Sequence, residues 1–115
     1  MPDKKSPLSG IKVIDCSRVL AGPYCCELLS LLGAEIIKVE NHSGDEGRMW
    51  PPHKGDMGSS FLGLNANKRS IAIDLKTARG AELVKDLAHD ADVLVENFKT
   101  GDMERFGLGY DDLKA

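Results

Sequence analysis

The sequence contains no apolar stretch that approaches the roughly 20 residues required for a membrane-spanning helix. Its N-terminal segment, MPDKKSPLSG, is charged and lacks the apolar core of a secretory signal. Positive charge is not in excess either, because 15 Lys and Arg side chains stand against 18 Asp and Glu, for a net charge of −3. This balance argues against general binding to nucleic acids or anionic membranes. We therefore expect a cytoplasmic protein that binds neither a membrane nor nucleic acid.

Cysteine is scarce, and the common nucleotide-binding motifs are missing. Three cysteines, Cys16, Cys25 and Cys26, are too few for a disulfide scaffold and form no Cys-x2-Cys pair of the kind that binds zinc. We interpret them as small buried or half-buried residues. The histidines lack metal-ligand spacing, so no metal is expected. Neither G-x-G-x-x-G nor G-x-x-x-x-G-K-[ST] occurs, which disfavours a standard NAD or FAD site and excludes a P-loop.

Short apolar runs and longer helical stripes alternate along the chain. They predict strands at 11–15, 36–40, 69–74 and 92–96, helices at 22–33, 77–89 and 101–106, and a capped turn at 110–113. This order predicts an α/β fold in which a mostly parallel, Rossmann-like sheet is covered by helices on both faces. We expect this domain over residues 10–115, after an N-terminal extension at residues 1–9.

Residues 41–60 have no periodicity and are rich in glycine, proline and polar side chains. A loop of this length in a compact domain is usually functional or mobile. Trp50, followed by two prolines, is interpreted as an anchor of the loop rather than a platform for a ligand. The apolar residues 61–64 are expected to form a short helical turn or a buried plug.

Polar side chains follow the predicted strands, and ligands of open α/β sheets bind beyond the carboxyl ends of the strands. The residues in these positions are Ser17, Arg18, Leu20, Ala21, Asn41, His42, Lys76, Asn97, Phe98, Lys99 and Arg105. Cations near three of the four strand ends suit a phosphorylated ligand, although Lys and Arg are also common in any loop. The acids at strand ends, Asp15, Glu40 and Glu96, are candidates for acid chemistry. The favoured interpretation is structural, with carboxylates that pair with neighbouring lysines or cap backbone amides.

Six segments occur in a characteristic order. They are PLSGIKVID (7–15), RVLAGP (18–23), LGAEIIKVE (32–40), NANKRSI (65–71), DVLVENF (92–98) and RFGLGY (105–110). Together they resemble the N-terminal part of the class III coenzyme A transferases, the family that includes formyl-CoA transferase and carnitine CoA-transferase. The likeness extends over nearly the whole chain from residue 7 onward.

The resemblance implies a longer enzyme whose Rossmann-like large domain begins with this chain. Family members form ring-shaped monomers that interlock as a homodimer, and they act on an acyl-CoA and a carboxylic acid. An aspartate accepts the acyl group as a mixed anhydride, and its position falls downstream of Ala115. No catalytic residue is therefore expected in this chain, which would supply part of the coenzyme A site.

The resemblance also implies which positions contact coenzyme A. They are Leu20, Ala21, Asn41, Ile73, Asp74, Leu75, Lys76, Asn97, Phe98, Lys99 and Arg105. Asn41 replaces an arginine of formyl-CoA transferase, whereas Arg105 matches an arginine that meets the nucleotide phosphates. The competing interpretation of Arg105 is an ion pair with Asp102 or Glu104 on its own helix.

Two alternative functions stay open at this point. The α-methylacyl-CoA racemase branch of the superfamily also binds CoA thioesters, but racemases tend to have E-P-F where this chain has Glu96-Asn97-Phe98, which favours the transferase. The other alternative is a non-catalytic binding or assembly module. The sequence does not distinguish acyl donors and acceptors of the formate, succinate, glutarate, carnitine and bile-acid types.

Overall fold

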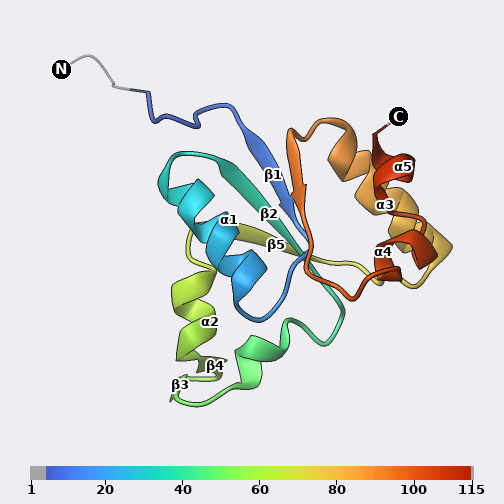
Figure 1. The fold of residues 1–115 in the computed structure, drawn as a ribbon. Helices are drawn as coiled ribbons and strands as arrows, with labels where there is room; N and C mark the ends of the chain where they lie inside the picture. The colour runs from blue at the N-terminus through green and yellow to red at the C-terminus, as the bar shows by residue number, and fades with distance from the viewer. Residues whose placement is uncertain (1–4, 115) are drawn as a thin grey trace.

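The structure, a computed structural model, describes residues 5–114 and is built around a four-stranded parallel sheet (Figure 1). The strands lie in the order β5 (Lys68–Ala72), β2 (Glu35–Glu40), β1 (Lys12–Asp15) and β6 (Val93–Val95). The main helices are α1 (Ala21–Leu31) and α3 (Ala78–His89), and the short helices α4 (Asp102–Arg105) and α5 (Tyr110–Leu113) follow β6. The expected α/β architecture is confirmed, and each predicted strand is present with slightly shifted ends.

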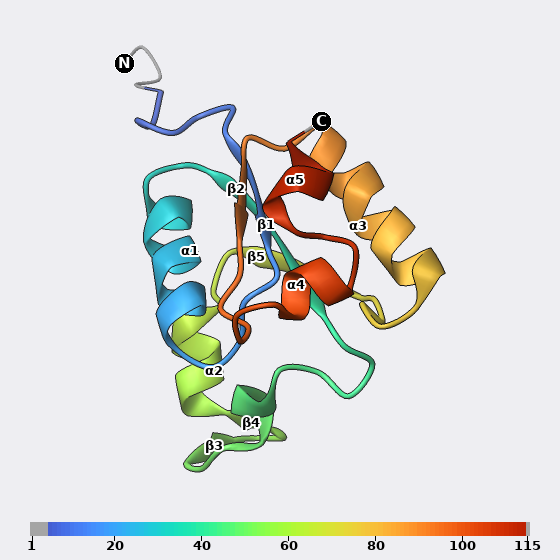
Figure 2. The same ribbon diagram turned by 45° about the vertical axis from the view of Figure 1, so that its right-hand side comes forward.

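The two main helices cover opposite faces of the sheet (Figures 1 and 2). Successive strand residues point to opposite faces, so neighbouring positions on β1 enter different cores. Val13 packs with Cys26 of α1, whereas Ile14 packs with Val84 of α3. From β1, the chain adds β2 and then β5 on one side of the sheet, and it adds β6 on the other side of β1. The strand order thus reverses between β1 and β6, and ligands of such sheets bind at this reversal.

Both ends of α1 are shaped by glycine. Gly33 has a φ of 103°, and its N–H donates to the Ser30 carbonyl while Ala34 N–H donates to the Leu29 carbonyl. These two bonds form a Schellman motif and end the helix where the sequence predicted. At the other end, a Cβ at Gly22 would lie 2.1 Å from the Cβ of Ser17, so only glycine lets α1 start this close to the end of β1.

The aperiodic segment between β2 and β5 is mostly folded, contrary to the expected long loop. It contains the 3-10 helix η1 (Glu46–Met49), the hairpin of β3 (His53–Lys54) and β4 (Met57–Gly58), and the helix α2 (Ser59–Leu64). The helix α2 confirms the predicted helical turn and lies on the same side of the sheet as α1 (Figure 1). Asp45 begins this ordered segment, because its carboxylate accepts the N–H of Gly47 and caps η1.

The cysteines are free, and Cys16 and Cys26 are buried as predicted. The prediction for Cys25 is wrong, because this side chain lies exposed on α1. Burial raises the pKa of the Cys16 and Cys26 thiols to about 12 in each case, with the negative charge of Asp15 adding to the effect. Both thiols are therefore neutral and unsuited to nucleophilic chemistry.

No helix in residues 5–114 is long and apolar enough to cross a membrane. Over the same residues, no three His, Cys, Asp or Glu side chains gather so that they could hold a metal ion.

Candidate functional site

A cavity of about 400 Å³ lies at the carboxyl ends of the strands. Its walls come from residues 16–18 after β1, residues 39–41 at the end of β2, residues 43–46 and 49 in the segment that follows, residues 74–76 after β5, and two aromatic rings, Phe98 and Phe106. Segments that are far apart in the sequence therefore meet at one site, in the position that the fold class predicts.

The structure brings together only part of the predicted ligand-contact set. Five of these residues line the cavity: Asn41, Asp74, Leu75, Lys76 and Phe98. They follow three different strands, so their convergence was not fixed by nearness in the sequence. The other six residues are placed elsewhere or are engaged in other contacts.

Those six residues divide by environment. Leu20 and Ala21 are exposed at the start of α1, and Ile73 is buried in the core on the α3 face, so its side chain is not available to a ligand. Lys99 lines a second cavity of about 590 Å³ beside β6, α4 and α5. The last two residues, Asn97 and Arg105, contact other parts of the chain.

Arg105 is exposed and pairs with Asp102 on the same turn of α4. This geometry is the ion pair that the competing interpretation of Arg105 described. Exposed pairs of this kind are weak, at about 0–1 kcal/mol, so the contact does not prevent Arg105 from meeting a ligand. A role for Arg105 at a phosphate stays a prediction.

Asn97 uses its side-chain amide to hold the turn after β1. Its Oδ1 accepts the N–H of Arg18 at 3.0 Å, and its Nδ2 donates to the carbonyl of Arg18 at 2.8 Å. The guanidinium of Arg18 lies over the ring of Phe98, 5.0 Å from its centroid. Phe98 in turn packs edge-on against Phe106 with 5.8 Å between the centroids. These contacts join the ends of β1 and β6 across the point where the strand order reverses.

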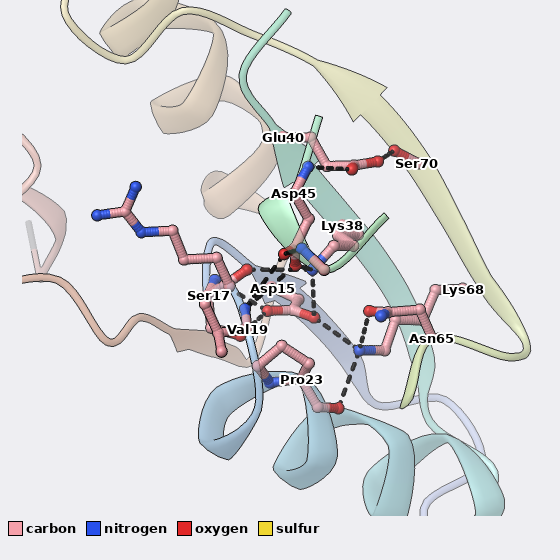
Figure 3. A network of polar contacts seen from close by, with 12 residues as sticks. Asp15, Ser17, Val19, Pro23, Lys38, Glu40, Asp45, Asn65, Lys68 and Ser70 are labelled. Atoms are coloured by element: carbon pink, nitrogen blue, oxygen red, sulfur yellow. Dashed lines mark hydrogen bonds and ion pairs between the residues drawn. The ribbon is translucent and has the colours of Figure 1, made fainter. Parts of the chain in front are cut away.

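A buried ionic cluster, which we define as Asp15, Lys38, Asp45 and Lys68, shares Asp45 with the lining of the cavity (Figure 3). Lys68 Nζ lies 2.9 Å from Asp15 Oδ2 and also donates to the Pro23 carbonyl. Lys38 Nζ lies 2.9 Å from Asp45 Oδ2 and 4.0 Å from Asp15 Oδ2. Two carboxylates thus balance two ammonium groups, as buried charges require.

The buried ionic cluster fixes the turn after β1. Asp15 accepts both the backbone N–H and the hydroxyl of Ser17, and Lys38 Nζ donates to the Ser17 carbonyl. Val19 has a φ of 72°, which is unusual for a β-branched residue, and its N–H donates to the Asp45 carboxylate. The cluster therefore holds a strained turn at the edge of the cavity in a single conformation.

A second ion pair fixes the chain after β2. Glu40 accepts two hydrogen bonds from Arg48, each of 2.7 Å, and further bonds from the Asp45 N–H and the Ser70 hydroxyl. Burial alone would raise the pKa of Glu40, but these hydrogen bonds and the charge of Arg48 lower it to about 2. Glu40 is therefore a permanent anion with a structural role.

The structural interpretation of the strand-end acids is confirmed for all three. Asp15 pairs with Lys68, Glu40 pairs with Arg48, and Glu96 accepts the N–H of Phe98 at 2.8 Å. Partners that are distant in the sequence were not predicted, such as Lys68 for Asp15, because the two residues are 53 positions apart. One available signal was Lys38, a lysine between the apolar residues Ile37 and Val39 of a predicted strand. A lysine that is buried in such a position needs a charged or hydrogen-bonding partner.

Comparison with known proteins gives a consistent picture. The model of CoA-transferase family III matches residues 8–115. An acyl-CoA transferase of Fusarium pseudograminearum is 50% identical over 93% of this chain, which is 26% of that relative. Succinyl-CoA:glutarate CoA-transferase of Mus musculus is 46% identical over 96% of this chain and 26% of its own length.

A solved structure agrees with these relatives. The crystal structure of a CAIB/BAIF family protein from Brucella suis superposes with a TM-score of 0.90 and 42% identity, over 96% of this chain and 31% of that one. This chain thus spans about a quarter to a third of the length of the proteins it matches, and in each case it corresponds to one part of a longer protein.

Proposed function

The chain belongs to CoA-transferase family III, and from that membership we propose that it is the N-terminal part of an enzyme that moves coenzyme A from an acyl-CoA to a carboxylic acid. The part described here supplies one portion of the coenzyme A site. The observation that carries the proposal is the convergence of Asn41, Lys76 and Phe98, which follow three different strands, on one cavity at the strand ends.

The reaction proposed for the longer protein uses a carboxylate nucleophile. An aspartate beyond residue 115 attacks the thioester carbonyl, the C–S bond breaks, and the coenzyme A thiolate leaves while the acyl group stays on the aspartate as a mixed anhydride. The thiolate then attacks the aspartyl carbonyl of the anhydride, which releases the donor acid as a carboxylate and leaves an aspartyl thioester. The acceptor carboxylate attacks this thioester and displaces the thiolate, and the thiolate finally attacks the acceptor carbonyl of the new anhydride, which gives the new thioester and frees the aspartate. Covalent catalysis of this kind divides one difficult exchange into easier steps.

Relatives of this chain suggest the class of acid. Several are named for dicarboxylic acids, including glutarate, mesaconate and malate, with succinyl-CoA as the donor. We propose a short dicarboxylic acid as acceptor and its thioester as donor for the longer protein.

A feature of the structure favours the transferase over the racemase branch. Asn97 bonds to both the N–H and the carbonyl of Arg18 through its side-chain amide. Proline, which racemases tend to have at this position, cannot make either bond because its side chain has no polar group. The turn after β1 is thus held here in a way that the racemase pattern does not provide.

Association is part of the same proposal. Leu20, Tyr24, Leu28 and Leu31 project from α1 with 44–66% of their surface exposed. An apolar stripe of this kind is typically covered in an assembled protein. This exposure agrees with the interlocked homodimer that the family resemblance implies, in which the rest of the longer protein or the partner subunit covers the stripe.

Trapping of the acyl-enzyme tests the proposed function. Longer protein incubated with succinyl-CoA and hydroxylamine should carry a hydroxamate on a single aspartate beyond residue 115, identified by peptide mass spectrometry. Protein without acyl-CoA serves as the control. Exchange of the substrate α-proton with deuterated solvent, without acyl transfer, would contradict the transferase and favour the racemase.

A further inference from the structure

Arg18 differs from the other arginines of the chain. Arg48, Arg69, Arg79 and Arg105 each form an ion pair, with Glu40, Glu35, Glu82 and Asp102 respectively. Within residues 5–114, the guanidinium of Arg18 takes part in no ion pair and no hydrogen bond, and its one contact of note is with the ring of Phe98. Its N–H donors are therefore free to bind an incoming group.

The position of this free guanidinium is fixed from three sides. The backbone of Arg18 exchanges two hydrogen bonds with the Asn97 side chain, and the N–H of the next residue, Val19, donates to Asp45. The head group rests on Phe98, which Phe106 supports from the side. A cation on an aromatic face is held there without using its hydrogen-bond donors.

The charged residues that line the cavity differ in whether they have ion-pair partners. Arg18 and Lys76 are the cations among the residues that line the cavity, and neither has a carboxylate partner within residues 5–114. Of the four acids in the lining, Glu40 is neutralised by Arg48 and Asp45 by Lys38. Asp74 accepts the backbone N–H of Lys76, and Glu46 has no ion-pair partner within residues 5–114. The free N–H donors of Arg18, rather than the net charge of the lining, favour an anion.

We propose that Arg18 binds a phosphate group at the nucleotide end of coenzyme A, and that Asn97 is a positioning residue that acts through Arg18. This inference rests on the proposed function and adds a residue that lies at a strand end but is not among the coenzyme A contacts that the family resemblance implies. A guanidinium presents a planar fork of donors that matches phosphate oxygens. A guanidinium binds the carboxylate of the acid substrate in the same way, so the test distinguishes a phosphate of coenzyme A from the substrate carboxylate.

The test is a calorimetric titration of coenzyme A and of pantetheine, which has the same thiol arm but no phosphate, into wild-type protein and variants. Arg18→Gln should weaken binding of coenzyme A about tenfold or more without changing the melting temperature, and should leave pantetheine binding unchanged. Arg18→Lys should restore part of the loss because it keeps the charge. Arg69→Gln is the matched control, since Arg69 is also exposed but pairs with Glu35 away from the cavity.

The outcomes separate this inference from the proposed function. Wild-type protein that fails to bind coenzyme A would overturn both. Wild-type binding that is unchanged in Arg18→Gln would overturn the inference alone. A loss confined to the KM for the acid substrate would show that Arg18 binds the carboxylate instead of the phosphate.

A double-mutant cycle tests the role of Asn97. If Asn97 acts through Arg18, Asn97→Ala should weaken coenzyme A binding, and the double variant with Arg18→Gln should bind no more weakly than Arg18→Gln alone. Additive losses would overturn the positioning role. Should Asn97→Ala melt at a lower temperature, Asn97→Asp replaces it in the cycle, because its carboxylate still accepts the Arg18 N–H but cannot donate to the carbonyl.

Discussion

Two groups of charged residues lie at the same edge of the sheet and are used in different ways. The buried ionic cluster consists of charges that satisfy one another, whereas Arg18 and Lys76 line the cavity with no carboxylate partner within residues 5–114. A buried charge must be paired because desolvation is costly, while an exposed charge keeps its hydration until a ligand replaces it. A charge near a ligand site is therefore no evidence of ligand contact until its partners are known.

The two groups are also connected. Asp45 belongs to the buried ionic cluster and holds Val19, which directly follows Arg18. Asp15 holds Ser17, which directly precedes Arg18. The paired charges thus set the shape of the turn from which the free charge extends, and the comparison predicts that the first group controls stability and the second group controls binding.

The largest effect is expected for Asp15→Ala. This change leaves Lys68 and Lys38 buried with one carboxylate between them, and breaking a buried pair typically costs about 3–5 kcal/mol of unfolding free energy. Denaturant unfolding measures the loss. Glu82→Ala, which removes an exposed partner of Arg79, is the control and should change stability by less than about 1 kcal/mol. An equal, small effect of both variants would contradict the distinction between the two groups.

A pH-dependent effect is expected for Glu40→Gln. The folded pKa of about 2 lies below the ordinary value of 4.5, so the ionised carboxylate stabilises the fold above pH 4.5, by about 3 kcal/mol. This contribution is lost as the pH falls from 4.5 towards 2. The stability difference between wild type and Glu40→Gln should accordingly be largest near neutral pH and shrink over that window in thermal melts. A difference that stays constant from pH 7 to pH 2 would show that the charge of Glu40 is not the cause.

The smallest effect is expected for Lys76→Ala. An ammonium is well solvated before binding, so its loss should weaken coenzyme A binding about three- to tenfold, less than the loss of Arg18, with no change in melting temperature. Lys85→Ala provides a control, because Lys85 is exposed on α3 and does not line the cavity. A fall in melting temperature for Lys76→Ala would place this lysine with the structural charges.

The sequence predicted the sheet well because the signals for it are local. The strands β1, β2 and β6 are short runs rich in apolar residues, and the Schellman end of α1 follows from Gly33 and its neighbours. The strand β5 was indicated by the alternate spacing of Ile71 and Ile73. The segment after β2 was predicted less well, because η1 and α2 depend on contacts with other parts of the chain, such as the stacking of Arg48 on Phe61 at 4.1 Å. Periodicity does not reveal contacts of this kind.

The candidate site was predicted only in outline for a similar reason. The rule for strand ends located the cavity, but it treated all cations there alike. The pairing of Arg105 with Asp102 is local, so it could be predicted as the alternative to a phosphate contact. The freedom of Arg18 depends on the absence of a partner anywhere within residues 5–114, and its support comes from Asn97, 79 residues away. Such long-range contacts are visible only once the chain is folded.

The most direct test of the central claim is a crystal structure of the longer protein with coenzyme A bound. The account predicts that the nucleotide end lies in the cavity of about 400 Å³ at the strand ends, with a phosphate oxygen within hydrogen-bond distance of Arg18 and the ammonium of Lys76 nearby. Electron density for coenzyme A in the cavity beside β6 instead, or with Arg18 turned away from every phosphate, would contradict it.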